Sequence, residues 1–384
     1  MASIAKRPNG KYRARYRDHD GREHSQHFTL KKDAQRWLDT VTTDIVTGRY
    51  VDPRGGRTTF EVFTTSWLAA QTTDVATRAA VQSRVTNHMM PTFGKLELRA
   101  IRPSTVQAWL RGRTEVCSPR TVRTLLSNLS SIMGAAVEDG LIATNPCAAS
   151  SVKPPALDGR RVEPWTREQV AAVVDAHPDR YRAIPVVTAG LGLRQGEVFG
   201  LRVEDIDFLR RRVLVRQQVK LVKGRPIFAP PKGRKEREIP LPEVVAVALA
   251  EHLRAWPAIE VALPWLDLDG EPRTAKLVFS TREHGPVIRN HYNGYTWKPA
   301  LVAAQVEPTR ANGMHALRHY YASALLDGGV SIRAVADYLG HADPGFTLRV
   351  YAHLMPAAED RARSAVDVAL GPRADSLRTG EVTP

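Results

Sequence analysis

The chain has 384 residues, 43% of them hydrophobic, which allows two or three domains with buried cores if a domain takes roughly 150 residues. It carries 55 Lys and Arg against 40 Asp and Glu, and the net charge of +15 favours a polyanionic partner, because each neutralised phosphate releases condensed counterions. The sequence has no run of about 18 apolar residues and no apolar signal-peptide core at its N-terminus, which argues against a membrane span or secretion. We therefore predict a cytoplasmic protein that binds nucleic acid, with an anionic membrane as the competing partner.

The first predicted element is a strand over residues 11–17, KYRARYR, whose strict alternation gives it two different faces. The face expected to pack carries Tyr12, Ala14 and Tyr16. The other face is cationic and carries Arg13, Arg15 and Arg17. We predict that this row of arginines contacts DNA; the alternative is a solvated strand face with incidental arginines.

Turn and capping signals extend this strand into a small N-terminal module. Asp20-Gly21 supplies hairpin turn chemistry before a second strand that ends at Phe28. Thr29 is expected to cap a helix with apolar residues at helical spacing, and Gly48 to end it. The residues therefore predict a strand-strand-helix DNA-binding module over 1–52.

A Pro- and Gly-rich stretch indicates a linker, after which residues 58–150 show only helical patterns. The clearest helix has Ser118 as its cap and Pro119 at its first position. Its apolar stripe, expected to form core, consists of Val122, Leu125, Leu126, Leu129, Ile132, Met133 and Val137. Ser104 is expected to cap another helix. These patterns predict an all-helical domain, followed by a second linker.

The third region, 162–370, combines helices with strands. Thr166 and Gln169 form a capping box near its start. Residues 211–222, RRVLVRQQVKLV, predict one strand, and Pro230–Pro242 predicts a further hairpin. The part that contains these strands is the most basic stretch of the chain.

These elements place the chain in the mainly α class with small β elements (α+β). The predicted organisation is an N-terminal β-sheet and helix module, an all-helical domain, and a mostly helical C-terminal domain with a β-hairpin sheet. The polar tail 371–384 is expected to be disordered.

Tyr351 is a candidate nucleophile for phosphodiester exchange. A tyrosine is a poor nucleophile at neutral pH, because its ordinary pKa is about 10. A cluster of cations would make its oxygen more reactive and would stabilise the charge that develops on phosphorus. Taken alone, Tyr351 is one of ten tyrosines and could be a packed aromatic. The neighbouring motifs make the chemical role the better interpretation.

Two motifs before Tyr351 carry histidine and arginine. His315 and Arg318 are three residues apart, so a helix would place them on one face, where both could point at one phosphate. His341 follows a short helix that is capped by Ser331 and stopped by Gly340, and a mobile loop is expected between it and Tyr351.

A metal site is the rival explanation of these histidines. His319 lies four residues after His315, as in a zinc-protease helix, but Ala316 stands where that motif needs glutamate. Cys117 and Cys147 have neither zinc-site spacing nor a secreted context and are expected to be reduced thiols. We predict no metal site.

Further cations come from two earlier segments. Arg194 stands among glycines 190, 192 and 196, which allow sharp turns that would aim its guanidinium at a phosphate; the segment does not match a dinucleotide-binding loop. Lys232 lies in the turn of the basic hairpin and could protonate a leaving oxygen, although Lys235 is equally placed. The hairpin cations predicted to contact DNA are Arg234, Lys235 and Arg237.

Together these segments resemble the tyrosine recombinase (phage integrase) family over about residues 165–360. The resemblance is carried by GLRQGEVFGL with DID, by HALRH, by YLGH and by TLRVYAHL. It implies one catalytic site made of Arg194, Lys232, His315, Arg318, His341 and Tyr351. It also implies that Glu197 orients Arg194. The helical region resembles the core-binding domain, and the KYRARYR module resembles the three-stranded arm-binding domain of integrases.

The resemblance implies a reaction without metal or cofactor. Tyr351 would attack the scissile phosphate to form a 3′-phosphotyrosyl link, while Lys232 protonates the leaving 5′-hydroxyl. Four protomers would join two double-stranded DNAs at core and arm sites and pass through a Holliday junction, with an excisionase or a DNA-bending host factor as accessory partner. The C-terminal helix near Ala357–Leu370 would pack on a neighbouring protomer.

The arm-like module favours the integrase of a phage or another mobile element, working at the nucleoid. One alternative is type IB topoisomerase-like cleavage of a single duplex. The other is a DNA-binding regulator with an inactive site, for which we would expect Tyr351 or an arginine to be replaced.

Overall fold

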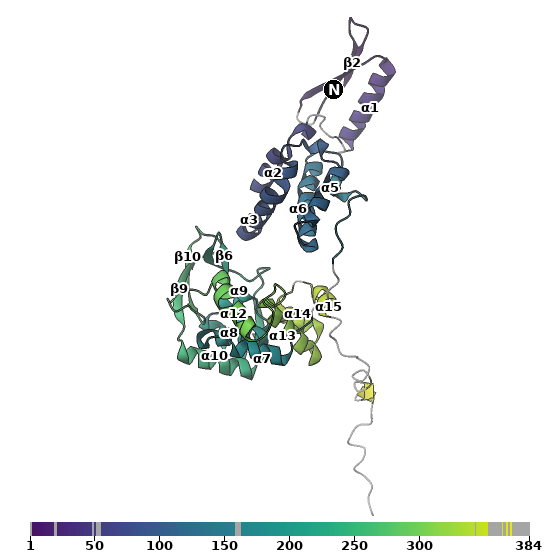
Figure 1. Ribbon diagram of the computed structural model, residues 1–384. Coiled ribbons are helices and arrows are strands. Elements are labelled where there is room, and N and C mark those ends of the chain that lie inside the picture. The colour runs from purple at the N-terminus through teal and green to yellow at the C-terminus, as the bar shows by residue number, and fades with distance from the viewer. Residues whose placement is uncertain are drawn as a thin grey trace, which may run out of the picture. The chain divides into compact units, whose positions relative to one another are not determined.

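The computed structural model describes residues 2–18, 21–47, 50, 55–157, 163–341 and 343–351, together with 363, 366, 367, 369 and 370. The chain divides into two compact units, Met1–Gly159 and Arg160–Pro384 (Figure 1). The described residues are mainly helical with small antiparallel sheets, which confirms the predicted fold class. The expectations for the C-terminal helix and the tail concern residues that lie largely or wholly outside this description.

The N-terminal module is a three-stranded antiparallel sheet with one helix. Its elements are β1 (Ser3–Lys6), β2 (Tyr12–Arg17), β3 (Glu23–Phe28) and α1 (Lys31–Val46), with β2 at the centre of the sheet. Ala14 and Tyr16 are buried against Ala34 and Leu38 of α1, as the alternation predicts. The residue pattern did not predict β1, because its four residues are mostly exposed and therefore lack an alternating apolar signal.

The expected cap of α1 is wrong by one position. Leu30 is the extended residue before the helix and gives no side-chain hydrogen bond, so Thr29 is not the cap. Gly48, the expected stop, lies outside the described residues, and the helix ends at Val46. Apolar packing rather than a cap therefore positions α1 on the sheet.

In the part of the chain that the structure describes, the rest of the first unit contains helices and no named strand. The helices are α2 (Phe60–Ala69), α3 (Val75–Arg84), α4 (Met90–Phe93), α5 (Pro103–Thr114) and α6 (Pro119–Glu138). Ser118 caps α6 by accepting a hydrogen bond from the Thr121 backbone N–H, as predicted, and the apolar stripe of α6 lies in the core. Ser104 is not a cap, because α5 begins one residue earlier at Pro103.

The predicted second linker packs in part on these helices. Val152 is buried in the helical core, and Arg123 donates a hydrogen bond to the Pro155 carbonyl. Residues up to at least 155 therefore belong structurally to the helical part, beyond the predicted boundary at 150.

The second unit contains most of the helices. They are α7 (Arg167–Asp175), α8 (Asp179–Leu191), α9 (Gln195–Phe199), α10 (Glu243–Ala255), α11 (Arg289–Tyr292), α12 (Lys298–Ala303), α13 (His315–Asp327), α14 (Ile332–Leu339) and α15 (Pro344–Tyr351). The capping box of Thr166 and Gln169 starts α7 as predicted. Helix α13 packs on α8 and α14, and α14 packs on α15 (Figure 1).

Short strands complete this unit. The three-stranded sheet contains β4 (Ile206–Asp207), β5 (Arg212–Val215) and β8 (Arg237–Pro240), and the two hairpins are β6 (Gln218–Val222) with β7 (Arg225–Ala229) and β9 (Ile259–Pro264) with β10 (Pro272–Leu277). The predicted single strand 211–222 is thus two strands in different sheets. They separate at Gln217, whose buried amide donates to the Gly200 carbonyl. The predicted hairpin Pro230–Pro242 is also wrong, because β7 and β8 pair with other strands.

None of the helices in the described ranges is both long enough and apolar enough to cross a membrane.

Candidate active site

All six predicted catalytic residues belong to the second unit, and different elements position them. Arg194 immediately precedes α9, His315 and Arg318 lie in the first turn of α13, and His341 follows α14. The last residue of α15 is Tyr351, so a helix occupies most of the stretch where a mobile loop was expected. Lys232 is exposed on a turn between β7 and β8. Four of these residues meet around the C-terminal end of α14: Arg194, His315, Arg318 and His341.

Backbone carbonyls at helix ends fix the two arginines. Arg318 donates from Nη1 to the Gly192 carbonyl at 2.6 Å and from Nη2 to the Leu339 carbonyl at 2.5 Å. Arg194 donates from Nη2 to the Gly340 carbonyl at 3.3 Å. The last carbonyls of a helix lack intrahelical partners and carry partial negative charge, so they suit a guanidinium. Both arginines are therefore oriented before any phosphate arrives.

Two glycines make these carbonyls available. Gly192 ends α8 and Gly340 ends α14, with φ of 61° and 65°, the left-handed conformation that glycine adopts most readily. A Cβ at Gly192 would lie 2.3 Å from the Tyr321 ring. Gly190 and Gly196 differ from the expectation of sharp turns, because both lie inside helices. They permit close packing instead, and a Cβ at Gly196 would lie 2.7 Å from the Val219 carbonyl oxygen.

A buried carboxylate joins Arg194 to a second arginine. Glu197 is 1% exposed and accepts hydrogen bonds from the Arg194 backbone N–H at 2.9 Å and from Arg194 Nη1 at 3.0 Å. It also accepts from Arg237 Nη1 at 3.0 Å and Nη2 at 2.6 Å. Burial alone would raise the pKa of Glu197, but the hydrogen bonds and charge of Arg237, with the charge of Arg194, lower it to about 2. Glu197 is therefore ionised and holds both guanidinium groups.

The position of Arg237 contradicts its predicted role as a DNA contact. Its side chain is 4% exposed and is paired with Glu197 inside the unit. Arg234 and Lys235, from the same predicted set, are exposed, and the Lys235 ammonium lies 3.8 Å from the exposed Asp337 carboxylate. The difference arises because β8 begins at Arg237 and turns this side chain inward, whereas the two preceding cations lie on the turn.

His341 is tied to both Arg318 and α15. Its Nε2 lies 3.1 Å from Arg318 Nη2, and its Nδ1 lies 2.7 Å from the Thr347 hydroxyl. A guanidinium can only donate, so Nε2 accepts and the ring proton lies on Nδ1. Burial, followed by the charges of Arg318 and Arg194, lowers the pKa of His341 to about 4. The ring is therefore neutral at physiological pH.

His315 lies at the exposed side of this cluster. Partial desolvation and then the charges of Arg318, Arg194 and Lys232 lower its pKa. Because the charge of Lys232 contributes to this shift, the lysine lies near enough to His315 to affect its pKa. His315 is therefore neutral at pH 7, and its ring can donate one hydrogen bond and accept another.

The Tyr351 hydroxyl is held by a residue that sequence reasoning did not assign to the site. Tyr351 is 2% exposed, and its oxygen lies 2.5 Å from His319 Nδ1. Burial raises the pKa of Tyr351 to about 12, although the charge of Arg318 acts in the opposite direction. Burial and the charges of His315 and Arg318 lower the pKa of His319 to about 4, so both groups are neutral. The tyrosine is therefore in a protonated, inward-facing state.

Comparisons with known proteins identify the family of the chain. The model described as "Phage integrase family" matches residues 165–357, and those for the phage integrase N-terminal and central domains match 2–47 and 60–152. The chain belongs to the phage integrase family. It is a tyrosine site-specific recombinase.

Curated relatives support the same family. This recombinase is 28% identical to a Mycobacterium tuberculosis protein named prophage phiRv2 integrase over 368 residues, which cover 92% of this chain and 91% of the relative. It is 29% identical to a XerC-like tyrosine recombinase of Caldanaerobacter subterraneus over 64% of this chain and 65% of that protein.

Two solved structures share the fold. The Tn1549 transposon integrase in complex with transposon right end DNA gives a TM-score of 0.68 at 20% identity, over 80% of this chain and 98% of that chain. A lambda integrase tetramer bound to a Holliday junction gives 0.58 at 16% identity, over 92% and 94% of the two chains.

Sequence reasoning could have found His319 in the recombinase site. His319 follows Arg318 directly and lies four residues after His315, so it shares a helix face with that histidine. It was considered only as a zinc ligand. The described residues contain no group of three or more His, Cys, Asp or Glu side chains arranged to hold a metal ion. Thr347 and Arg237 gave no comparable signal, because their partners lie on other elements.

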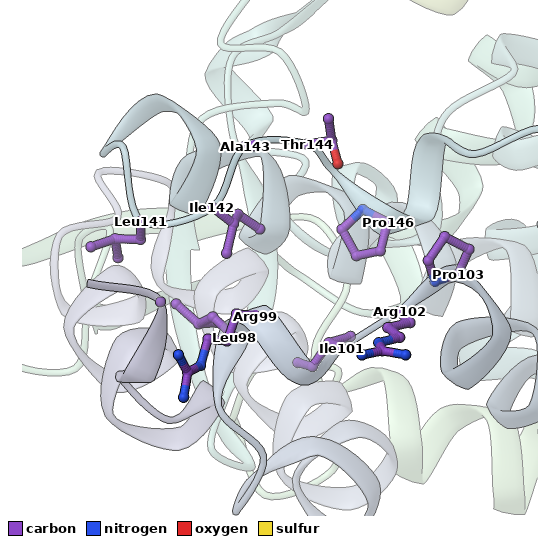
Figure 2. A pocket seen from close by; sticks show the side chains of 11 residues that line it. Leu98, Arg99, Ile101, Arg102, Pro103, Leu141, Ile142, Ala143, Thr144 and Pro146 are labelled. Carbon is purple, nitrogen blue, oxygen red and sulfur yellow. The ribbon is translucent and has the colours of Figure 1, made fainter. Parts of the chain in front are cut away.

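A pocket of about 350 Å³ in the helical part of the first unit is separate from these residues. Figure 2 shows that Leu98, Ile101 and Pro146 line it together with the stems of Arg99 and Arg102. None of the six candidate catalytic residues belongs to its lining.

Proposed function

We propose that this recombinase is the integrase of a phage or another mobile element and that Tyr351 cuts DNA by attacking the scissile phosphate. The observation that carries the proposal is the meeting of Arg194, Arg318 and His341 at the end of α14, with Tyr351 on the adjacent helix α15. The similarity to a protein named prophage integrase supports the biological source.

Arg194 and Arg318 hold the nonbridging oxygens of that phosphate. Their carbonyl partners already fix both guanidinium groups, so little reorganisation is needed when negative charge develops. Burial and the charge of Arg194 lower the pKa of Arg318 to about 9, which leaves it protonated at neutral pH. His341 joins them when its ring proton lies on Nε2 instead of Nδ1, so that Nε2 donates to a phosphate oxygen in place of accepting from Arg318.

Tyr351 becomes a nucleophile only after its hydroxyl leaves His319. In the cleavage step its oxygen forms a bond to phosphorus as the bond from phosphorus to the 5′ oxygen breaks. The phenolic proton passes to the neutral His315, and Lys232 supplies a proton to the leaving 5′ oxygen. The 5′-hydroxyl of the partner strand then reverses these bonds, so the phosphodiester energy is conserved without a cofactor.

Double-stranded DNA is the proposed partner, bound by four copies of the chain. The DNA-bound Tn1549 integrase and the lambda integrase tetramer on a Holliday junction support this assembly by analogy of fold. Residues 58–150 would bind the core site, and the module 1–52 would bind arm sites. The proposed DNA contacts are Arg13, Arg15, Arg17, Arg234 and Lys235. An excisionase or a DNA-bending host factor would set direction at the nucleoid.

Covalent trapping in EDTA tests the proposal. The substrate is a set of nicked duplexes from the DNA that flanks this gene, and the proteins are the native chain, Tyr351→Phe and the matched control Tyr295→Phe, whose tyrosine is 75% exposed. We expect a 3′-linked adduct with the native chain and with Tyr295→Phe but not with Tyr351→Phe.

Three other outcomes would contradict the proposal. Relaxation of supercoiled DNA without any strand exchange between duplexes would favour a type IB topoisomerase-like activity. DNA binding without any adduct on the flanking sequences would favour a regulator with an inactive site. An adduct that persists in Tyr351→Phe would assign the nucleophile to another residue.

A further inference from the structure

Three successive backbone carbonyls at the end of α14 each accept a hydrogen bond from a different arginine. We call the carbonyls of Tyr338, Leu339 and Gly340 the α14 terminus. Arg318 of α13 and Arg194 before α9 bind the second and third of them, as described above. The first carbonyl accepts from Nε of Arg237 on β8 at 2.7 Å. Two of these arginines are proposed phosphate ligands, but the third is buried and has no assigned role.

Arg237 connects the α14 terminus with the carboxylate that orients Arg194. Its two terminal nitrogens form a bidentate pair with Glu197, and the same carboxylate binds the Arg194 side chain and backbone. Its stem also packs beneath Gly340, where a Cβ would lie 3.1 Å from Arg237 Cδ. Gly340 directly precedes His341. Arg237 thus contacts the supports of two proposed phosphate-binding groups at once.

We propose that Arg237 is a positioning residue for DNA strand cleavage: through Glu197 it fixes the guanidinium of Arg194, and through the Tyr338 carbonyl it fixes the end of α14 that carries His341. The proposal rests on the function proposed above. Arg237 touches no DNA in this scheme, and its effect on cleavage is exerted entirely through Glu197 and α14.

Arg237 helps to keep the buried carboxyl group of Glu197 ionised. The charged groups that face it are Arg194, Arg237 on β8 and Arg318 on α13. Removing Arg237 leaves a fully buried carboxylate with one direct cationic partner, which is costly in a low-dielectric interior. Burial then raises the pKa of Glu197 from its native value of about 2. A protonated Glu197 would no longer hold Arg194.

Loss of Arg237 should therefore change the pH profile of cleavage. In the native chain Glu197 stays ionised well below pH 5, and His341 stays neutral above it, so the rate should show little acid-side loss from these groups between pH 5 and pH 8. In Arg237→Met the raised pKa of Glu197 brings its protonation toward this range. The cleavage rate should therefore fall further as the pH decreases.

Single-turnover cleavage of the trapping duplex by saturating full-length protein tests this inference from pH 5 to pH 8. The variants are Arg237→Met, Arg237→Lys, Arg237→Met with Glu197→Gln, and the control Arg212→Met. Arg212 lies on the neighbouring strand β5 and pairs with Glu238 in an exposed ion pair. DNA affinity and thermal melting are measured on the same samples.

We expect Arg237→Met to slow cleavage by about 10- to 100-fold at pH 8, because small displacements of catalytic groups have effects of this size. DNA affinity should stay within about threefold, since the side chain does not reach the surface. Arg237→Lys should recover part of the rate by restoring the charge without the bidentate fork. The additional Glu197→Gln change should remove the acid-side loss, because it removes the titrating group.

A native cleavage rate and pH profile in Arg237→Met would overturn the inference. So would a parallel loss of DNA affinity, cleavage and melting temperature, which would indicate a general structural role. If Arg237→Met does not fold, Arg237→Lys provides the test. An unchanged cleavage rate at native DNA affinity in that variant would show that the bidentate guanidinium of Arg237 does not position the site. Absence of an adduct from the native chain would instead count against the proposed function itself.

Discussion

Arginines pair with acids in two different environments of this recombinase. In the N-terminal sheet, Arg13 pairs with Glu23 at 3.2 Å, and the two side chains are 29% and 36% exposed. In the second unit, Arg237 pairs with Glu197 at 2.6 Å, and the side chains are 4% and 0% exposed. Water screens the first pair, so it contributes little and leaves the arginine able to exchange its partner. The second pair is buried away from water. It can therefore fix the positions of both side chains, but separating the two charges would leave each of them buried and unpaired.

The comparison separates arginines that bind from arginines that position. A cation that must meet successive phosphates benefits from an exposed, exchangeable pair, as on β2. A cation that must orient a reacting group benefits from a fixed one, as at the α14 terminus. The predictions below test this separation.

The largest effect is expected from removing the buried acid. Glu197→Ala leaves Arg194 and Arg237 without their shared carboxylate and should destabilise the second unit by about 3–5 kcal/mol. Glu23→Ala, the matched change in the exposed pair, should cost no more than about 1 kcal/mol. Calorimetric unfolding of the full-length variants measures both. Equal losses of stability in the two variants would contradict the proposed difference between the buried and the exposed pair.

The next effect concerns catalysis. Arg318→Lys removes donors that are held by the Gly192 and Leu339 carbonyls, and cleavage should fall by about 10²–10³-fold, the usual consequence of losing one donor to a developing charge. Arg15→Lys on the exposed strand should leave cleavage of an isolated core site unchanged. Single-turnover adduct formation distinguishes the two. A similar loss in both variants would show that exposure does not separate their roles.

A smaller effect is expected at the nucleophile's hydrogen bond. His319→Ala leaves the buried Tyr351 hydroxyl without its partner and should destabilise the fold by about 1–3 kcal/mol. His319→Asn retains an oxygen acceptor near the position of Nδ1 and should recover part of that loss. Thermal melting of the two variants and the native chain measures the difference. If both variants melt together with the native chain, this hydrogen bond does not hold Tyr351.

The smallest effect should come from the exposed arginines one at a time. Arg17→Ala removes one cation from β2 without breaking the sheet, because its side chain faces solvent. If Arg17 contacts one phosphate, the slope of log affinity for arm-site DNA against log salt concentration should fall by about 1. Binding titrations at several salt concentrations measure that slope. An unchanged slope would place the DNA on another face of the module.

Local patterns anticipated many features of the fold and part of the site. As predicted, Ser118 and Ser331 cap their helices and Gly340 ends α14. These features are predictable because the interactions involve residues within four positions of one another. The alternation in β2 likewise identified its buried face. The same local logic placed His315 and Arg318 on one helix, but it treated His319 only as a metal ligand and so missed its contact with Tyr351.

The sequence by itself determined which chemical groups are available: the arginines, histidines, lysine and tyrosine of a recombinase, carried in short segments whose helix ends and turns are locally encoded. Only the tertiary structure decided which of these side chains are buried and which are exposed. Lys235 and Arg237 are two residues apart, yet one is exposed and the other is buried, because Arg237 meets Glu197 from 40 residues away and Tyr338 from 101 residues away. Such contacts depend on how distant elements pack, and no local pattern of charge or hydrophobicity specifies them.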